Sequence, residues 1–303
     1  MTPPPPWESS WIRPPRRRQS LGIRIVEILR GGPLDRAGLE IQPGAVIEAI
    51  DGEEVTPEVD PARLLNRKAE RNVHLRVRHP GGEVRAVVVR PVSLAEENRL
   101  RYERWVEANR REVEERSEGR LGYIHIPGMN DPAYRNTFEE VLGRHFDKEG
   151  LVIDIRSNGG GDLVADLEMF FSGRHFFEYT TDTRSSGFEP SFRWTRPSVT
   201  LADENNYSDG HCFAWAYKEM GIGPLIGMPV AGTCTFGGGQ TLLDGLGFGV
   251  PGRGVQDATT GRFLENWQTE PDIPVRNEVG ILDRGRDQQL ERAVEELLRI
   301  VGG

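Results

Sequence analysis

The sequence predicts an α/β chain in two parts, a small β-rich module followed by a larger domain built on a parallel sheet. Three observations lead to this fold class. Short apolar runs separated by glycine- and proline-rich turns fill residues 20–92. Beyond residue 119, apolar strands alternate with helical segments, and the run at 150–155 is apolar almost throughout, as in strands buried on both faces. The length of 303 residues also fits about two domains.

Composition indicates a folded globular protein and argues against several classes of function. Hydrophobic residues make up 37% and charged residues 28% of the chain, a balance typical of globular proteins. The formal net charge of -9 argues against nucleic-acid binding by the chain as a whole. No apolar run approaches the length of a membrane-spanning helix. The six histidines lack paired metal-ligand spacing, and Cys212 and Cys234 make neither a disulfide framework nor a metal-ligand set, so we expect no metal or other cofactor.

The chain begins with a proline- and arginine-rich arm, followed by the β-rich module. Residues 1–19 can bury little surface, and we expect them to be extended or disordered. Within the module at 20–92, Asp51-Gly52 is a dipeptide that commonly turns one strand into the next. The sequence pattern predicts strands at 23–29, 45–50, 73–78 and 84–89, with helices at 34–39 and 61–69.

A long charged helix is predicted over residues 93–118, where Ser93 and Glu96 have the spacing of a capping box. The α/β domain at 119–303 follows it. Its predicted strands are 121–126, 150–155, 198–202 and 224–227, and its predicted helices are 134–142, 163–171, 213–220 and 288–300. A loop rich in glycine and threonine is expected at 232–239, before edge strands at 241–244 and 247–250.

Ser208 is the first candidate functional residue, because it lies between the predicted strand at 198–202 and the helix at 213–220. A serine at a strand-to-helix turn has an exposed hydroxyl next to helix amides that can stabilise negative charge. The competing interpretation is that Ser208 or Asp209 is only a helix N-cap, a role that both residue types fill routinely.

The second candidate feature is the glycine loop Gly159–Gly161, which follows the buried strand at 150–155. Backbone amides can approach a ligand closely where no Cβ intervenes. The loop lacks the spacing of nucleotide-binding motifs, and a purely structural turn is the alternative. Together, a serine at one strand end and amides at another fit an acyl-transfer site, in which the serine attacks a carbonyl and N–H groups hold the oxyanion.

The chain resembles a known family across residues 20 to the end. The segments "GGPLDRAGL" (31–39) and "PGAVIEAIDG" (43–52) resemble a PDZ domain of the bacterial protease-associated type. The segments "GRLGYIHIP" (119–127), "LVIDIRSNGGG" (151–161), "NYSDGH" (206–211) and "LENWQTEPDI" (264–273) resemble the tail-specific, or C-terminal processing, serine peptidases and most closely their tricorn branch.

The resemblance implies a catalytic domain of Clp-protease/crotonase-like α/β architecture at 119–303, behind the PDZ-like domain and the linker helix. By position, Ser208 is implied as the nucleophile, the amides of Asp209 and Gly161 as the oxyanion hole, and Glu265 as the carboxylate that supports the charge relay. The implied substrate-binding residues are Leu21, Gly22 and Ile23 in the carboxylate-binding loop of the PDZ-like domain, Gly160 in the glycine loop, and Glu178, which would select basic side chains. For Glu178, a surface charge without function is the alternative.

Two departures from the family pattern concern the general base. Tail-specific members pair the serine with a lysine, and the corresponding neighbourhood here, residues 227–232, contains none. The tricorn branch takes its histidine from a segment before the PDZ domain, and the residues before position 20 contain none. We therefore expect the base from an N-terminal segment missing from this chain. His211, three residues after Ser208, is poorly aimed and is assigned a structural role, while His125 is a more remote candidate.

The function implied is a serine-type peptidase acting on peptides or unfolded proteins. The alternative from another class is an inactive peptide-binding protein, favoured by the absent base and the PDZ-like groove. A crotonase-type acyl-CoA enzyme is a weaker third interpretation. A homo-oligomer is expected for the full-length form, and a cytoplasmic location is expected with export left open.

Overall fold

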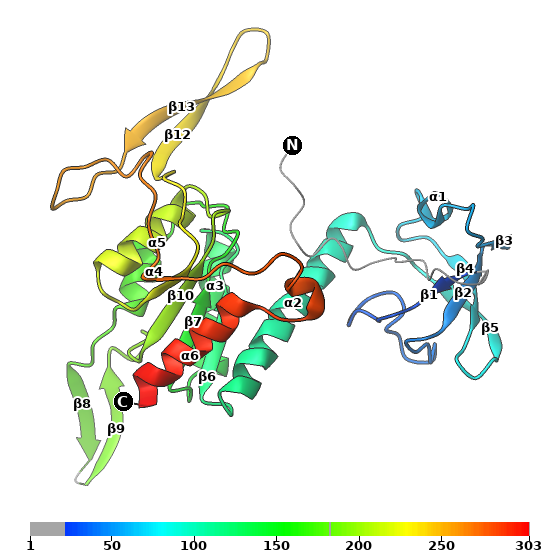
Figure 1. The fold of residues 1–303 in the computed structure, drawn as a ribbon, viewed down its shortest axis with the longest axis horizontal. Helices are drawn as coiled ribbons and strands as arrows, with labels where there is room; N and C mark the ends of the chain where they lie inside the picture. The colour runs from blue at the N-terminus through cyan, green and yellow to red at the C-terminus, as the bar shows by residue number, and fades with distance from the viewer. Residues whose placement is uncertain (1–21, 182, 303) are drawn as a thin grey trace. The chain divides into compact units, whose positions relative to one another are not determined.

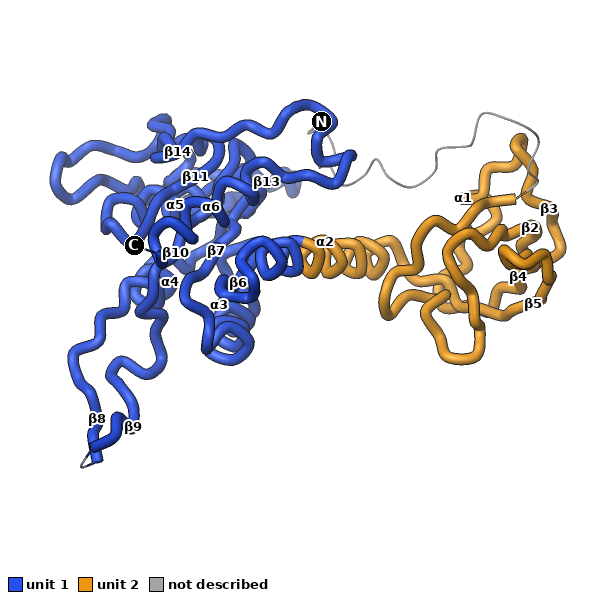
Figure 2. Tube along the Cα trace, turned by 60° about the horizontal axis from the view of Figure 1, so that its bottom comes forward, with its two compact units in different colours: residues 1–9, 109–303 blue, residues 10–108 orange. Residues whose placement is uncertain are grey.

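The structure is a computed structural model that describes residues 22–181 and 183–302, in two compact units divided near residue 108 (Figure 2). The expected arm at 1–19, Leu21 and Gly303 lie outside the described residues. The family-like segments fall in both units. The PDZ-like segments lie in the unit at 22–108 (orange in Figure 2), and the serine and glycine-loop segments lie in the unit from 109 onward, the second along the chain (blue).

The unit at 22–108 is built on an antiparallel sheet, as its alternating runs predict. The strands lie in the order β1-β2-β4-β5, with β3 paired to β2. The bounds are β1 Ile23–Arg24, β2 Val46–Ile50, β3 Glu53–Glu54, β4 Val73–Arg78 and β5 Val84–Val89, with one helix, α1, at Pro61–Leu65. In β4, Val73, Leu75 and Val77 are buried against a small apolar core, which is the alternation expected of a sheet with one covered face.

Local geometry explains where this unit follows the prediction and where it departs from it. Asp51 and Gly52 have φ values of 50° and 83°, so they form a two-residue hairpin turn of the mirror-image type. The predicted helix at 34–39 is wrong, and the segment forms turns instead, because Gly38 has a left-handed φ of 89°, which interrupts a helical backbone. α1 ends at Leu65, since Asn66 leaves the helical region with ψ 130°. The predicted strand at 23–29 is only two residues long.

The predicted long helix is α2, Leu94–Arg116, and Ser93 begins it as expected. The hydroxyl of Ser93 accepts a hydrogen bond from the N–H of Glu96 at 3.2 Å. Its first part belongs to the unit at 22–108, and the part from Asn109 onward belongs to the second unit.

The second unit is built on a parallel sheet of five strands in the order β14-β11-β10-β7-β6. The strands are β6 Leu121–His125, β7 Gly150–Asp154, β10 Ser198–Ala202, β11 Leu225–Gly227 and β14 Ile273–Pro274. The helices are α3 Asp131–Glu139, continued by a π-helical turn at Glu140–Arg144, then α4 Val164–Phe171, α5 Asp209–Glu219 and α6 Gln288–Gly302. β7 and β10 are adjacent and fully buried, in agreement with their apolar sequences.

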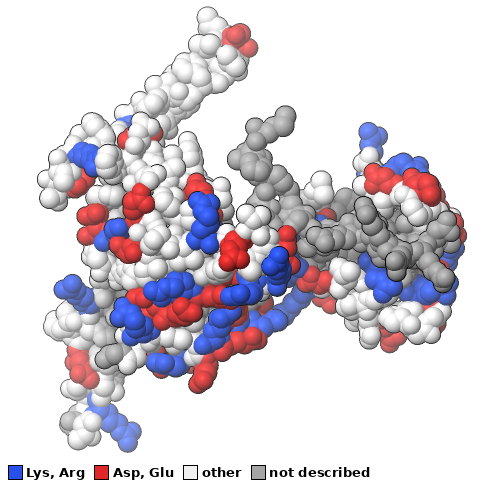
Figure 3. Space-filling view, viewed as in Figure 1, with Lys and Arg blue, Asp and Glu red and all other residues white. Residues whose placement is uncertain are grey.

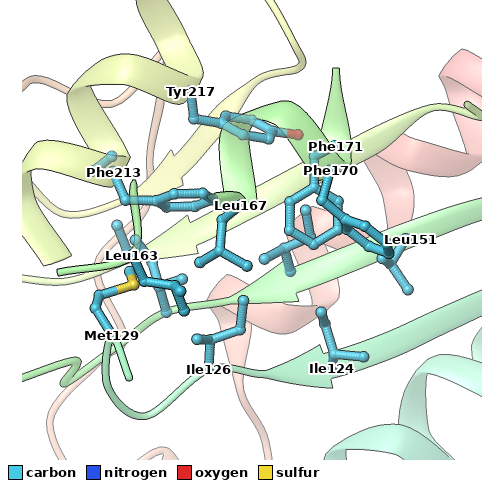
Figure 4. Packing of buried hydrophobic residues seen from close by; sticks show 14 of the residues in the cluster. Ile124, Ile126, Met129, Leu151, Leu163, Leu167, Phe170, Phe171, Phe213 and Tyr217 are labelled. Atoms are coloured by element: carbon cyan, nitrogen blue, oxygen red, sulfur yellow. The ribbon is translucent and has the colours of Figure 1, made fainter. Parts of the chain in front are cut away.

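Helices cover both faces of this sheet. Alternate residues of β7 point to opposite faces. On one face, Leu151 and Ile153 belong to the main core with Phe213 and Tyr217 of α5, as Figure 4 shows for the labelled side chains. On the other face, a Cβ added to Gly150 would lie 3.0 Å from Leu297 of α6. The sheet is therefore the middle layer, and functional groups can lie only at its ends.

Two hairpins extend from opposite ends of this unit (Figure 1). They are β8 Phe177–Thr181 with β9 Arg184–Glu189, and β12 Thr235–Thr241 with β13 Gly247–Gly254. The loop predicted at 232–239 is thus largely strand, because ladder hydrogen bonds need only backbone groups and the glycines of β12 supply them. Figure 3 shows that the β12–β13 hairpin carries few charged side chains.

Within the described part of the chain, no helix combines the length and the hydropathy needed to cross a membrane. Cys212 and Cys234 are joined in a disulfide, a pairing that the sequence reasoning did not anticipate. The two residues are far apart in sequence, on α5 and directly before β12, and only the fold brings them together.

Candidate active site

Ser208 lies at a sharp turn between β10 and α5. Its φ of 51° and ψ of -121° are unusual for a residue with a side chain, and such a conformation costs on the order of 1–3 kcal/mol. Ser208 occupies the N-cap position, yet its hydroxyl makes no capping hydrogen bond to α5. Asp209 does not cap α5 either, because its Oδ2 accepts the N–H of Leu163 at 2.7 Å, just before α4. The hydroxyl of Ser208 therefore has no capping role in this turn.

The glycine loop packs directly against this turn. Gly160 has a φ of 86°, and a Cβ added there would lie 2.7 Å from both Ser208 Cβ and the Tyr207 carbonyl oxygen. Gly161 has a φ of 149°, and a Cβ there would lie 1.8 Å from the carbonyl oxygen of Met129. Both positions need glycine because another part of the backbone occupies the space of a side chain.

Asn158 holds the loop and the turn together. It is fully buried, and its side-chain amide donates to the carbonyl of Ile126 at 2.7 Å and accepts the N–H of Gly160 at 2.8 Å. Its backbone carbonyl accepts the N–H of Tyr207 at 2.9 Å. One residue thus joins the end of β6, the glycine loop and the residue before Ser208.

Two backbone amides at this junction are unengaged. Among the described residues, neither the N–H of Gly161 nor that of Asp209 donates a hydrogen bond. Asp209 is the first residue of α5, where helix N–H groups have no partner within the helix. Free N–H groups beside a serine hydroxyl are the donors that an oxyanion requires.

A buried ion pair supports the strand that leads into the glycine loop. Arg156, directly after β7, donates to Asp154 Oδ2 at 2.6 Å and to Asp287 at 2.7 Å. Desolvation acts to raise the pKa of Asp154, but the charge and hydrogen bonds of Arg156 outweigh it and hold that pKa below its ordinary value. Next in the chain, the N–H of Ser157 donates to Asp203 at 2.8 Å, which ties the loop to the end of β10.

Glu265 lies beside this site rather than in contact with Ser208. Its Oε2 is buried and has no hydrogen-bond partner among the described residues. Its negative charge acts on His211 and favours the protonated ring, although burial dominates and lowers the pKa of His211 to about 4. Glu265 follows Leu264, which packs against the Cys212–Cys234 disulfide.

Neither of the two histidines considered from the sequence is placed to act on Ser208. His211 uses both ring nitrogens, accepting the N–H of Thr233 at Nδ1 and contacting Thr269 at Nε2. This agrees with the structural role assigned to it. His125 Nε2 lies 3.0 Å from the carbonyl oxygen of Arg156, and burial lowers the pKa of the ring.

The remaining predicted site residues do not belong to the Ser208 turn or to the glycine loop. Glu178 lies on β8, an exposed hairpin beyond the C-terminal end of α4, whereas the N-terminal end of that helix adjoins the glycine loop. Gly22 and Ile23 belong to the other unit, where β1 is the outermost strand of its sheet, and Leu21 lies outside the described residues. Sequence reasoning missed Asn158 and Thr233. The asparagine directly before the three glycines was the available signal for the first.

Comparison with known proteins gives the same assignment for both parts of the chain. The family model "Peptidase family S41" matches residues 120–275, and the model "Tricorn protease PDZ domain" matches residues 26–93. The chain is 34% identical over 268 residues to tricorn protease homolog 1 of Streptomyces coelicolor, covering 86% of this chain and 24% of that protein. It is 32% identical over 264 residues to the tricorn protease of Thermoplasma acidophilum, covering 84% and 24% respectively.

The fold is similar to a solved structure of the tricorn protease. The TM-score is 0.79 at 27% sequence identity, and the match covers 89% of this chain and 26% of that one. The chain therefore spans about a quarter of the length of the curated relatives and of the solved structure that it matches.

Proposed function

Because this chain belongs to peptidase family S41, we propose that it forms the PDZ and nucleophile-bearing part of a tricorn-type serine peptidase, which hydrolyses peptide bonds. The observation that carries the proposal is the junction of Ser208 with the glycine loop. There the serine hydroxyl has no capping role, Gly160 packs against Ser208, and among the described residues the N–H groups of Gly161 and Asp209 donate no hydrogen bond. A purely structural turn would not need to keep these three groups available together.

In the proposed reaction, Ser208 Oγ bonds to the carbonyl carbon of the scissile peptide and gives up its proton to a base. The carbonyl oxygen becomes an oxyanion and accepts hydrogen bonds from the N–H groups of Gly161 and Asp209. The intermediate collapses, the amine leaves with a proton, and water then hydrolyses the ester on Ser208. Because Gly160 has no side chain, the glycine loop would present only backbone to the substrate peptide beside Ser208.

We propose that the general base is supplied by residues outside those described. The support is that His211 has both ring nitrogens engaged and that His125 contacts the carbonyl of Arg156. Glu265 would orient that base, since one of its carboxylate oxygens is buried without a partner among the described residues. Removal of such a base lowers the rate but leaves the catalysis that binding and an oxyanion hole provide.

Peptide substrates would also be held by the PDZ unit. The outer edge of β1 can accept an extended peptide as an added strand, with the backbone at Gly22 and Ile23 holding the terminal carboxylate. Selection of basic side chains by Glu178 is a further part of the proposal, although Glu178 does not contact the Ser208 turn within this unit.

Homo-oligomer formation is proposed on the exposed aromatic side chains of the β8–β9 hairpin, among them Phe177, Tyr179 and Phe188. An isolated two-stranded hairpin gains little stability by itself, so a covering surface would stabilise it. Light scattering of the purified chain tests this, and a monomer at all concentrations would contradict it.

The test of the function is labelling of Ser208 by a fluorophosphonate probe, with and without added imidazole as an external base. We expect imidazole to accelerate labelling in proportion to its concentration, because the nucleophile and the oxyanion donors are in place. The control is Ser208→Ala, which should abolish labelling without changing the fold. Equal labelling of the two proteins, or none in either at high imidazole, would contradict the proposal and favour a protein that only binds peptides.

A further inference from the structure

The loop at 230–234 holds the backbone amide of Ser208. The N–H of Ser208 donates to the hydroxyl oxygen of Thr233 at 2.9 Å. The hydroxyl proton of Thr233 is directed elsewhere, because Oγ1 donates to the carbonyl of Ala231 at 3.3 Å. The oxygen lone pair is therefore left to accept from Ser208.

His211 fixes the position of Thr233 from the first turn of α5. The backbone N–H of Thr233 donates to His211 Nδ1 at 3.2 Å. Since a backbone N–H can only donate, Nδ1 must be the unprotonated ring nitrogen, and the ring proton lies on Nε2. Nε2 then donates to the hydroxyl of Thr269 at 3.0 Å. The surroundings fix the tautomer, and the ring is fully buried.

The same loop is tied to the segment that carries Glu265. Val230 and Thr269 exchange both backbone hydrogen bonds at 2.9 Å. The N–H of Asn266, the residue after Glu265, donates to the carbonyl of Gly232 at 2.8 Å. The next residue after Thr233, Cys234, is bonded to Cys212 of α5. The loop at 230–234 is thus fixed at several points between the serine turn and the glutamate segment.

We propose that Thr233 and His211 are positioning residues that hold Ser208 in its strained backbone conformation and fix its position relative to Glu265. The inference deepens the proposed function and rests on it for the meaning of the site. A residue stays at a φ of 51° and a ψ of -121° only where its surroundings over-determine it. The ψ angle of Ser208 also sets the direction of the Asp209 N–H, so whatever holds the Ser208 backbone aims the proposed oxyanion donor.

The neutral state of His211 is required for this arrangement. A protonated ring would carry hydrogens on both nitrogens and could not accept from Thr233. Burial lowers the pKa of His211 to about 4, against the opposing effect of the charge on Glu265, so the accepting form is present at neutral pH.

Two pairs of matched variants test the inference in the whole chain. Thr233→Val removes the hydroxyl at nearly constant volume, and Thr233→Ser retains it. His211→Asn places an acceptor near the position of Nδ1 and loses the Thr269 contact, whereas His211→Gln places its amide near Nε2 and loses the bond to Thr233. The first measurement is hydrogen exchange of the Ser208 amide by NMR, and the second is the rate of Ser208 labelling with imidazole present.

We expect exchange of the Ser208 amide to be roughly tenfold faster in Thr233→Val and His211→Gln, the size expected for loss of one hydrogen bond to a part-buried amide. Labelling should be slower in the same two variants by a similar factor. Thr233→Ser and His211→Asn should remain within about twofold of the parent chain in both measurements. The ring nitrogen shifts of His211 should also report the proton on Nε2.

Unchanged exchange in Thr233→Val, or equal exchange in the two His211 variants, would overturn the inference. The exchange measurement does not require a nucleophile and can be repeated in Ser208→Ala. If the exchange pattern holds there while no variant with Ser208 is labelled, the positioning role stands and the peptidase proposal fails. The two ideas can thus be separated by experiment.

Discussion

Replacement of Gly160 by alanine probes the contact on which the candidate site depends. The new Cβ would lie 2.7 Å from Ser208 Cβ and from the Tyr207 carbonyl, and 2.9 Å from the N–H nitrogen of Asp209. Two of these three atoms belong to the backbone, so the serine turn itself must move. Alanine at a φ of 86° adds a cost on the order of 1–2 kcal/mol.

Crowding of a packed site by one added methyl group typically costs about 1–3 kcal/mol. We therefore expect Gly160→Ala to lower the free energy of unfolding by roughly 2–5 kcal/mol. Where the variant still folds, displacement of Ser208 and the Asp209 amide by about 1 Å should slow labelling of Ser208 on the order of a hundredfold. Urea denaturation and the rate of fluorophosphonate labelling are the two assays.

Gly159→Ala is the matched control, one residue away. A Cβ on Gly159 would have no atom within 4 Å, and its φ is not left-handed. We expect its unfolding free energy to change by no more than about 0.5 kcal/mol, with labelling unchanged. If Gly160→Ala behaved like Gly159→Ala in both assays, the close approach of the glycine loop to Ser208 would be refuted.

Three further predictions follow from buried groups of the same unit. Burial raises the pKa of Glu168 to about 8 from its ordinary value of 4.5, so between these pH values the folded state keeps a proton that the unfolded state releases. The free energy of unfolding should therefore fall by up to about 4–5 kcal/mol as pH rises through this range, and Glu168→Gln should remove the dependence in urea titrations at pH 5 and 8.5. The Cys212–Cys234 disulfide joins residues 22 apart, so replacing both cysteines by alanine should lower the free energy of unfolding by about 3 kcal/mol under oxidising conditions. Adding reductant to the parent chain should cause an equal loss of stability, and thermal melts measure both effects. Asn158→Ala should lower the unfolding free energy by about 2–4 kcal/mol, because it leaves the Gly160 amide and the Ile126 carbonyl without their partner, and a denaturation midpoint equal to that of the parent chain would contradict this.

Local sequence was sufficient for the regular elements of the sheets. β4 and β5 match their predicted limits, and β10 does as well, because alternating or fully apolar runs specify strands without reference to the rest of the chain. Local sequence was insufficient where a segment had no strong pattern of apolar residues. The hairpin β8–β9 was not predicted, and β12 was taken largely as a loop, since its ladder depends on a partner strand.

The candidate site shows the same division. The residue types at the ends of β7 and β10, glycines in one case and a serine in the other, indicate acyl-transfer chemistry from the sequence alone. The fold brings them into contact, because it makes β7 and β10 adjacent parallel strands whose ends lie at the same edge of the sheet. Glu178 could not be placed in this way, because its position depends on a hairpin that leaves the domain.

The sequence by itself determined most strands and helices of the two units and the strand-to-helix turn at Ser208, because these depend on periodicity over a few residues. The need for glycine at Gly160 and Gly161 was decided by the fold, since backbone distant in sequence occupies the space of their side chains. The tertiary structure decided which distant residues hold the turn. Thr233 and His211 contact each other, and Cys212 bonds to Cys234, across more than twenty residues of chain. Such contacts have no local sequence pattern, since they arise only when α5 and the loop before β12 pack at the same end of the sheet.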